Sequence, residues 1–452
     1  MVFTETYSAH HPPFHVLLLG GIIRVIYKLT KSYNAGIAVY IFAQMLFLSG
    51  CFSYVVCFLG HIGVKKWICN ISIVFLALFP TVSMFVCCST KDGIFSAGVL
   101  LFCTLLLEMA RDVDWFWKQR SRKLGMIFSI LLILLFRNNG IYAFAVFLIP
   151  FALIYKKWWR KWIPSMAVSL LIFGVITGGL TAVFHFEKGE TAEMLCVPMQ
   201  QLARVYTEEK GSFTNDELDT LYRLIPQDIL KNYRPKLADD VKVGFDEEAF
   251  RESFSEYVSL WVEKGLQHPD IYVNSFLANT YGFWYPDTVL DAYRGRKMTE
   301  LIYEDSSYFA FDTERPGIRM HLLPALERFY QKISLEIYQQ RLPVISMFFS
   351  IGFWNWLYMF LIFYLLTTER KRQACAMGIM GVLYLTVLLG PVALVRYVLY
   401  FFFACPLFLA MLFDAEMVGG GRVEKFRKLG ESDEKTDRKK DRGSYSVPEN
   451  IV

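Results

Sequence analysis

Long uncharged apolar stretches constrain this chain more than any other feature of its sequence. Residues 37–59, 163–184 and 344–366 contain no Asp, Glu, Lys or Arg. A helix needs roughly 20 apolar residues to cross ~30 Å of hydrocarbon, and a soluble helix of that length would normally carry a polar face. Composition agrees, because 54% of the residues are hydrophobic and only 20% are charged. We therefore expect an all-α fold, built as a polytopic transmembrane helix bundle.

Candidate spans follow one another along the chain. They are residues 34–59, 67–88, 93–110, 124–136, 141–155, 163–184, 343–366, 376–389 and 392–413. Two of them, residues 124–136 and 141–155, are too short to cross comfortably, which indicates paired short helices that meet at a polar turn. The predicted domains are an N-terminal membrane domain (1–184), a helical insert (185–342), C-terminal membrane helices (343–413) and a disordered charged tail (414–452).

Short basic clusters between the spans predict the orientation of the chain. They fall at residues 65–66, 111–123, 156–161, 370–372 and 422–442. Because cytoplasmic loops carry the excess of Lys and Arg, one topology places all of these clusters in the cytoplasm. The insert is then extracytoplasmic and the C-terminus is cytoplasmic. The formal net charge of +5 is small and is confined to these clusters, so nucleic acid is not expected as a partner.

The insert is expected to be mainly helical, because apolar residues recur in it at the spacing of one helix face. These residues are Phe250, Phe254, Tyr257, Val258 and Trp261. We expect this helix to begin after Asp246 and to end at Gly265. Of the nine cysteines, Cys196 alone lies in the insert, so no disulfide can form within it.

Four groups of polar residues interrupt or border the apolar stretches, where charge is costly and often functional. They are His10 with His11, Lys91 with Asp92, Arg137 with Asn138, and Arg396 with Tyr397. In the topology above, all four groups fall at the outer edge of the bilayer. Two arginines, a lysine and a carboxylate at one membrane face predict a lipid-linked phosphate as the ligand.

Each group also has a structural interpretation that stays open. His10 and His11 could open a capped interfacial helix, or could act as proton carriers or metal ligands. Asp92 could cap its helix, or serve as a general base or metal ligand. Arg396 could bind phosphate or pair with an acidic residue such as Asp92. A divalent metal is left open as a cofactor.

These motifs resemble the C-type membrane glycosyltransferase (GT-C) superfamily, which includes protein O-mannosyltransferases. The resemblance rests on His11-Pro12-Pro13-Phe14 at the start of a juxtamembrane helix and on Asp92 two spans later. It implies a GT-C-like bundle that takes a sugar from a polyprenyl-phosphate carrier and passes it to an acceptor outside the cytoplasm. The superfamily carries a further helix and a catalytic aspartate upstream of the Pro-Pro motif. Because this chain starts just before that motif, a truncated and inactive form is a competing expectation.

A closer resemblance is to a bacterial family of multi-spanning membrane proteins, domain of unknown function 6020. The matching pieces are His10–Pro13, Lys91-Asp92, Arg137–Gly140, Val197–Arg204, His268–Tyr272, Asn279–Pro286 and Arg396-Tyr397. The resemblance places the acceptor near five residues of the insert, namely Gln200, Gln201, Arg204, Trp284 and Tyr285.

The expected function is therefore a cell-membrane glycosyltransferase with a lipid-linked sugar donor and an envelope glycan or protein as acceptor. Asp92, His10 and His11 would be catalytic. The carrier phosphate would bind Lys91, Arg137, Asn138, Arg396 and Tyr397. A transporter or flippase of lipid-linked saccharides and an envelope assembly partner are the alternatives.

Overall fold

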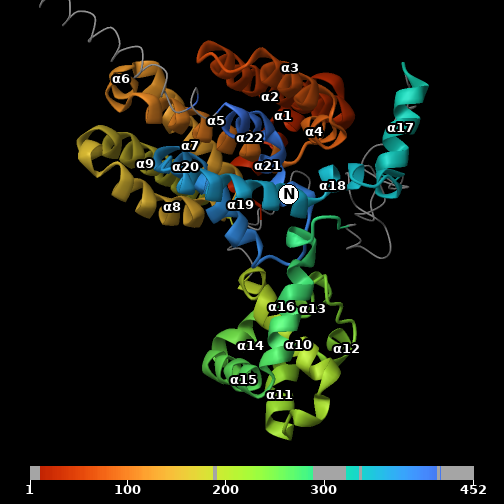
Figure 1. Ribbon diagram of the computed structural model, residues 1–452. Coiled ribbons are helices and arrows are strands. Elements are labelled where there is room, and N and C mark those ends of the chain that lie inside the picture. Colours follow the sequence, from red (N-terminus) through yellow and green to blue (C-terminus); the bar gives the residue numbers. More distant parts are fainter. Residues whose placement is uncertain (1–10, 187–190, 289–321, 335–337, 415–417, 419–452) are drawn as a thin grey trace, which may run out of the picture.

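The computed structural model describes residues 11–186, 191–288, 322–334, 338–414 and 418, and the regular elements in these ranges are helices (Figure 1). The β pairing in the same ranges is limited to an isolated bridge between Arg234 and Leu237. The predicted all-α class is therefore confirmed. His10, residues 289–321 of the predicted insert and residues 419–452 of the predicted tail lie outside the described residues.

Apolar helices form one large bundle. It contains α1 (Pro13–Thr30), α2 (Tyr33–His61), α3 (Lys66–Leu78), α4 (Pro80–Val86), α5 (Lys91–Arg111), α6 (Val113–Lys118), α7 (Arg120–Phe136), α8 (Gly140–Ile154), α9 (Trp159–Phe184), α18 (Ile345–Phe349), α19 (Ile351–Thr367), α20 (Lys371–Val387), η6 (Val395–Val398), α21 (Leu399–Phe403) and α22 (Cys405–Phe413). Among the described residues, four helices are long and apolar enough to cross a membrane, or up to six if each of two bent pairs counts as one span. These helices indicate a membrane protein.

Proline breaks two of the predicted spans. Residues 67–88 are not one helix, because α3 and α4 are separated at Pro80 and bent by 57°. A residue before proline is disfavoured in helical conformation, and Phe79 is accordingly extended, with ψ of 122°. Residues 392–413 become helical only from η6 onward and bend by 45° before α22, where Pro406 lies in the first turn.

Helix α5 lies at the centre of the bundle. Of the 18 consecutive residues that form its most apolar part, 89% are buried. Such burial is expected of a helix that is apolar on nearly all sides. It packs against α7, α20, α21 and α2. Charged residues are found at its two ends, with Lys91 and Asp92 at the start and Glu108 near the end. Glu108 pairs with Arg122 of α7 at 2.8 Å.

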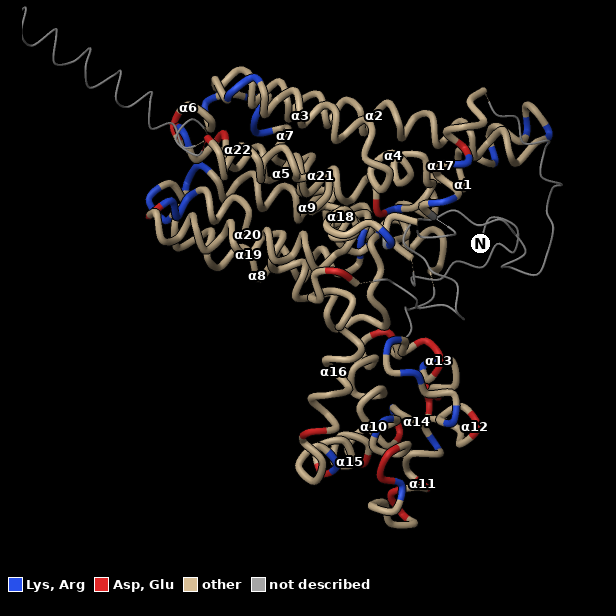
Figure 2. Tube along the Cα trace, turned by 45° about the vertical axis from the view of Figure 1, so that its right-hand side comes forward, with Lys and Arg blue, Asp and Glu red and all other residues tan. Residues whose placement is uncertain are grey.

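Several of the basic clusters lie together at the Glu108 end of the bundle, whereas the helices between the two ends carry few charges (Figure 2). Lys161 at the start of α9 pairs with Asp114 of α6. Arg372 at the start of α20 lies over the ring of Trp158, 5.1 Å from its centroid. The expectation that these clusters share one side of the bundle therefore agrees with the structure.

The polar turn between α7 and α8 has the predicted form, with two short helices meeting at Arg137-Asn138-Asn139. Gly140 begins α8 directly against the end of α7. A Cβ atom at this position would lie 2.2 Å from the carbonyl oxygen of Ile133, so the sharp turn depends on a glycine. The turn places Arg137 at the Lys91 end of α5, because α5 and α7 pack closely along their lengths.

Residues 191–284 form a second helical unit, which we call the lobe and which projects from one side of the bundle (Figure 1). It contains η2 (Thr191–Met194), α10 (Cys196–Glu208), η3 (Lys210–Ser212), α11 (Asn215–Leu224), α12 (Gln227–Leu230), α13 (Asp239–Lys242), α14 (Glu247–Glu252), α15 (Phe254–Gln267) and α16 (Pro269–Trp284). The lobe has its own hydrophobic core, centred on α10, α11 and α15.

The predicted helix around residues 250–261 is wrong in two respects. It is interrupted at Ser253, whose backbone leaves the helical conformation, with φ of -113° and ψ of 28°. Gly265 does not end it, because α15 continues to Gln267. The start is as expected, since Asp246 caps α14 by accepting from two backbone amides.

The lobe returns to the bundle through α16, which packs on α19. The hydroxyl of Tyr384 donates to the carbonyl oxygen of Phe283 (3.0 Å). The indole of Trp356 donates to the carbonyl oxygen of Trp284 (2.7 Å). Farther along the chain lie α17 (Pro324–Ser334) and η5 (Tyr338–Arg341), which lead into α18.

Candidate functional site

Four segments that are distant in sequence meet at the start of α5. They are the chain before α1, the first turn of α5, the turn between α7 and α8, and η6. The last three contribute Lys91, Asp92, Arg137 and Arg396, which we call the Asp92 cluster, and the first contributes His11 beside Lys91. The structure therefore brings together the charged residues that the sequence singled out within and beside the apolar helices.

Asp92 is buried, with 2% of its surface exposed, although it lies in the first turn of a helix. It is not the N-cap that one interpretation of the sequence expected. Thr90 holds that position, and α5 begins at Lys91. A carboxylate in the first turn is still favoured by the helix dipole. The helix thus fixes Asp92 at the base of the cluster rather than at its rim.

Arg137 forms an ion pair with the carboxylate of Asp92. Its Nε lies 3.6 Å from Asp92 Oδ1, an ionic contact too long for a good hydrogen bond. Its Nη1 donates to the carbonyl oxygen of Tyr397 (3.0 Å). The guanidinium also lies over the rings of Phe95 and Tyr397, at 5.2 and 5.0 Å. Arg137 is 8% exposed, so these contacts hold a nearly buried charge in place.

Lys91 and Arg396 complete the cluster. Lys91 Nζ donates to Nδ1 of His11 (3.3 Å), and its charge interacts with those of Asp92, Arg137 and Arg396. The Arg396 guanidinium lies over the ring of its neighbour Tyr397, 5.1 Å from the centroid. Three cations therefore surround one carboxylate. Glu193 of the lobe also acts on the charge of Lys91. Basic side chains gathered in an apolar setting are suited to binding an anion.

Three buried polar atoms beside the cluster accept or donate no hydrogen bond within the described chain. They are Asp92 Oδ1, Ser96 Oγ and Tyr400 Oη. Ser96 lies one helical turn after Asp92 on the same face, and the charge of Arg137 acts on Tyr400. Buried polar atoms are nearly always hydrogen-bonded, so ordered water or a polar ligand is the expected partner of these atoms.

The histidines divide between the rim and the interior. His11 is exposed and contacts Lys91, while His10 lies outside the described residues. His15 was not singled out from the sequence. It is buried in α1, its Nε2 is 3.1 Å from the hydroxyl of Tyr40, and its ring packs against Phe136. Its position two residues after the Pro-Pro pair, in an apolar stretch of the helix, could have identified it.

The asparagines of the turn have separate surroundings. Asn138 is exposed beside the cluster. Asn139 donates from Nδ2 to the hydroxyl of Thr386 in α20 (2.7 Å), which ties the turn to a third helix. Asn139 therefore has a structural contact that the sequence did not reveal.

The residues expected on the acceptor side lie in or beside the lobe, where most make local structural contacts. Gln200 donates to the carbonyl oxygen of Arg234 (3.1 Å). Gln201 accepts from the indole of Trp261 (2.9 Å) and is buried. Arg204 pairs with Glu208 one turn along α10 (2.8 Å), and the rings of Tyr281 and Tyr285 stack at 4.9 Å. The indole of Trp284 donates to Thr280 one turn earlier (3.3 Å).

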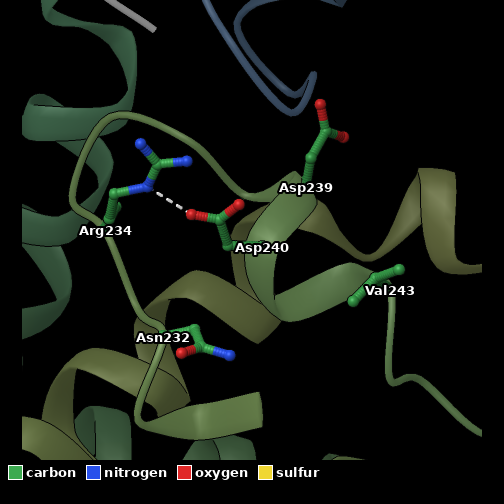
Figure 3. A pocket seen from close by; sticks show the side chains of 5 residues that line it. All are labelled: Asn232, Arg234, Asp239, Asp240 and Val243. Carbon is green, nitrogen blue, oxygen red and sulfur yellow. Dashed lines mark hydrogen bonds and ion pairs between the residues drawn. The ribbon is translucent and has the colours of Figure 1, made fainter. Parts of the chain in front are cut away.

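An open hollow of about 600 Å³ lies in the lobe (Figure 3). It is lined by Asn232, Arg234, Asp239, Asp240 and Val243. Figure 3 shows Arg234 paired with Asp240 across the loop that precedes α13. Asp239 is paired with Lys242 (2.8 Å). The charged side chains lining the hollow are thus paired locally.

Comparison with known proteins gives one match. The model of a family of unknown function (DUF6020) matches residues 3–441, nearly the whole chain. No curated protein and no solved structure matches the chain.

Proposed function

The chain belongs to the DUF6020 family, and since the function of that family is unknown, we propose one from the residues themselves. The protein is a membrane glycosyltransferase that takes a sugar from a polyprenyl-phosphate carrier and passes it to a cell-envelope acceptor outside the cytoplasm. The observation that supports this proposal most is the Asp92 cluster, in which three cations and one buried carboxylate meet at the end of apolar helices.

Phosphate on a lipid is the anion that fits this location. Guanidinium groups bind phosphate oxygens in a fixed planar geometry, and a lysine adds a mobile point charge. Arg137 and Arg396 both lie on the ring of Tyr397, so the two guanidiniums are held close together despite their like charge. A polyprenyl chain could extend along the exposed apolar sides of the neighbouring helices while its phosphate enters the cluster.

The chemistry follows from the charges. A hydroxyl oxygen of the acceptor attacks the anomeric carbon, and the bond between that carbon and the phosphate oxygen breaks. The leaving phosphate keeps the electron pair, and Lys91, Arg137 and Arg396 stabilise its growing negative charge. Asp92 accepts the proton of the attacking hydroxyl. Buried, pre-positioned charges are well suited to this task because they need little reorganisation.

A divalent metal fits the described cluster poorly. Calcium and magnesium need several oxygen ligands, and Asp92 is the carboxylate of this cluster, with three cations around it. Within the described ranges no group of three His, Cys, Asp or Glu side chains lies close enough to hold a metal ion. The mechanism above therefore contains no metal-dependent step.

Transfer from a radiolabelled polyprenyl-phosphate sugar in membranes tests the proposal. We expect Asp92→Asn to lower transfer roughly hundredfold, as loss of a general base does. Asp112→Asn is the matched control, because Asp112 caps α6 at the opposite end of α5 and asparagine also caps helices. Equal transfer by Asp92→Asn and wild type would exclude the assigned role. Movement of the lipid across vesicles without covalent transfer would instead favour a transporter.

The proposal also requires the lobe and the cluster to lie on the outer side. Single cysteines placed in a cysteine-free variant test this orientation. A cysteine at the exposed position 252 of the lobe should react with a membrane-impermeant maleimide in intact cells. One at position 160, within a basic cluster, should react only after permeabilisation. The opposite labelling pattern would contradict both the orientation and the proposed side of transfer.

A further inference from the structure

Residues 390–397, which we call the strap, follow α20, include most of η6 and contact the lobe at their first two positions. The side-chain amide of Asn279, in α16 of the lobe, donates to the carbonyl oxygen of Gly390 (3.1 Å). The backbone amide of Ala238 donates to the carbonyl oxygen of Pro391 (2.8 Å). Asn279 is 3% exposed. Two separate parts of the lobe therefore hold the same end of the strap.

Apolar contacts continue along the middle of the strap. Leu237 of the lobe forms a small buried cluster with Val392 and Leu394, and Tyr397 packs against it. Ala393 and Val395 of the strap belong to the core of the bundle, and Tyr397 packs against that core as well. The strap therefore lies between the lobe and the bundle and contacts both.

The far end of the strap holds the Asp92 cluster. The carbonyl oxygen of Tyr397 accepts from Arg137 Nη1 (3.0 Å), and the Tyr397 ring lies beneath both Arg137 and Arg396. A shift of Tyr397 would therefore move two of the three cations. Arg396 itself belongs to the strap, so the strap supplies one cation and orients another.

We propose that Asn279 is a positioning residue, which fixes the geometry of the Asp92 cluster through the strap and so makes phosphate binding depend on the lobe. The inference rests on the proposed function for the identity of the ligand. Asn279 acts on the cluster mechanically, through a series of contacts. An amide in the lobe holds Gly390, the strap is short and packed, and Tyr397 at its other end touches both arginines.

Asn279→Ala and Asn279→Asp test this inference in the full-length protein reconstituted in nanodiscs. Both variants remove the donor to Gly390, and the aspartate keeps the size of the side chain. We expect polyprenyl phosphate to bind about tenfold more weakly, the effect of losing roughly one well-placed hydrogen bond. Amide hydrogen exchange should rise in peptides covering the strap and also in the turn at residues 137–140.

Tyr384→Phe is the matched control. It also removes one hydrogen bond between α16 and the membrane helices, but that bond is to Phe283 and does not involve the strap. Its phosphate affinity and its exchange at residues 137–140 should equal those of the wild type. The same losses in Tyr384→Phe would show general loosening of α16 and overturn the inference.

The remaining outcomes separate the two proposals. If wild type fails to bind polyprenyl phosphate, the proposed function fails, and the exchange at residues 137–140 still decides the role of Asn279. If wild type binds and both Asn279 variants bind equally well, with exchange altered only near Gly390, the positioning role is excluded.

Discussion

Arg137→Met is expected to abolish binding of polyprenyl phosphate and to destabilise the protein. Methionine keeps much of the apolar length of the side chain but removes the charge beside Asp92, which is 2% exposed. Breaking a buried ion pair on one side leaves an uncompensated charge and costs about 3–5 kcal/mol. The carbonyl oxygen of Tyr397 also loses its donor. Thermal unfolding in detergent and a binding assay with labelled polyprenyl phosphate measure the two effects.

The double variant Arg137→Met with Asp92→Asn separates stability from function. Removing both charges should restore most of the stability, because no buried charge is left unpaired. It should not restore phosphate binding. A double variant that binds phosphate as well as wild type would contradict the role given to Arg137.

Arg122→Met is the matched control for this experiment. Arg122 pairs with Glu108 at 2.8 Å, so the variant also breaks an ion pair of α5, but at the other end of the helix. We expect it to lower stability and to leave phosphate binding unchanged. Loss of binding in Arg122→Met would mean that any disturbance of α5 weakens phosphate binding. It would contradict a specific role of the Asp92 cluster in that binding.

The sequence predicted the apolar helices, because hydrophobic length is a local property, but of nine candidate spans the described residues show four to six helices that could cross a membrane. It missed the breaks within residues 67–88 and 392–413, where Pro80 and Pro406 interrupt the stretches, and the break at Ser350 within residues 343–366. The prediction of a single helix around residues 250–261 was wrong for a different reason. A periodic apolar face predicts helical structure, but it does not show that the backbone leaves the helical conformation at Ser253.

The candidate site was partly predictable for a similar reason. A charge in an apolar stretch is conspicuous, so Lys91, Asp92, Arg137 and Arg396 could be identified one by one. Their convergence depends on how α5, α7 and η6 pack, and no spacing in the sequence shows it. Ser96 and Tyr400 were missed because a single hydroxyl in an apolar helix is usually a satisfied core residue. Only the lack of a hydrogen-bond partner distinguishes these two.

The strap shows the same limit at longer range. Asn279 belongs to the Asn279–Pro286 piece that resembles the family pattern, which does not indicate what the residue contacts. Its contact with Gly390 joins residues that are 111 positions apart in the chain. Sequence patterns of one helix carry no information about such a contact. Tertiary structure was needed to connect the lobe with the Asp92 cluster.

The second large effect is expected in the lobe, where Lys264 is buried in its core with 1% of its side chain exposed. Its Nζ lies 2.9 Å from Glu217 Oε1 and donates to the carbonyl oxygen of Ser212 (2.8 Å) and to Gln267 (3.0 Å). Glu217→Gln removes the countercharge and should destabilise the lobe by about 3 kcal/mol or more. Hydrogen exchange of lobe peptides in the full-length protein measures this loss.

Two variants test whether the buried charge is the cause. Adding Lys264→Met to Glu217→Gln should recover most of the stability, since the double variant buries no lone cation. Glu256→Gln is the control, because Glu256 and Arg223 form an ion pair of 2.7 Å in which both side chains are 54% exposed. It should change stability little. Equal effects of Glu217→Gln and Glu256→Gln would show that burial of Lys264 is unimportant.

The same pair predicts how the stability of the lobe depends on pH. Burial tends to raise the pKa of Glu217, but hydrogen bonds from Lys264 and from the backbone of Thr214 outweigh it and hold the pKa below its usual value. A carboxyl group with a lowered pKa contributes stability that is complete above its unfolded pKa and is lost as the pH falls through the folded value. Wild type should therefore lose lobe stability on acidification below the ordinary glutamate range. The double variant Glu217→Gln with Lys264→Met should lose less over the same range, and identical pH profiles would refute this assignment.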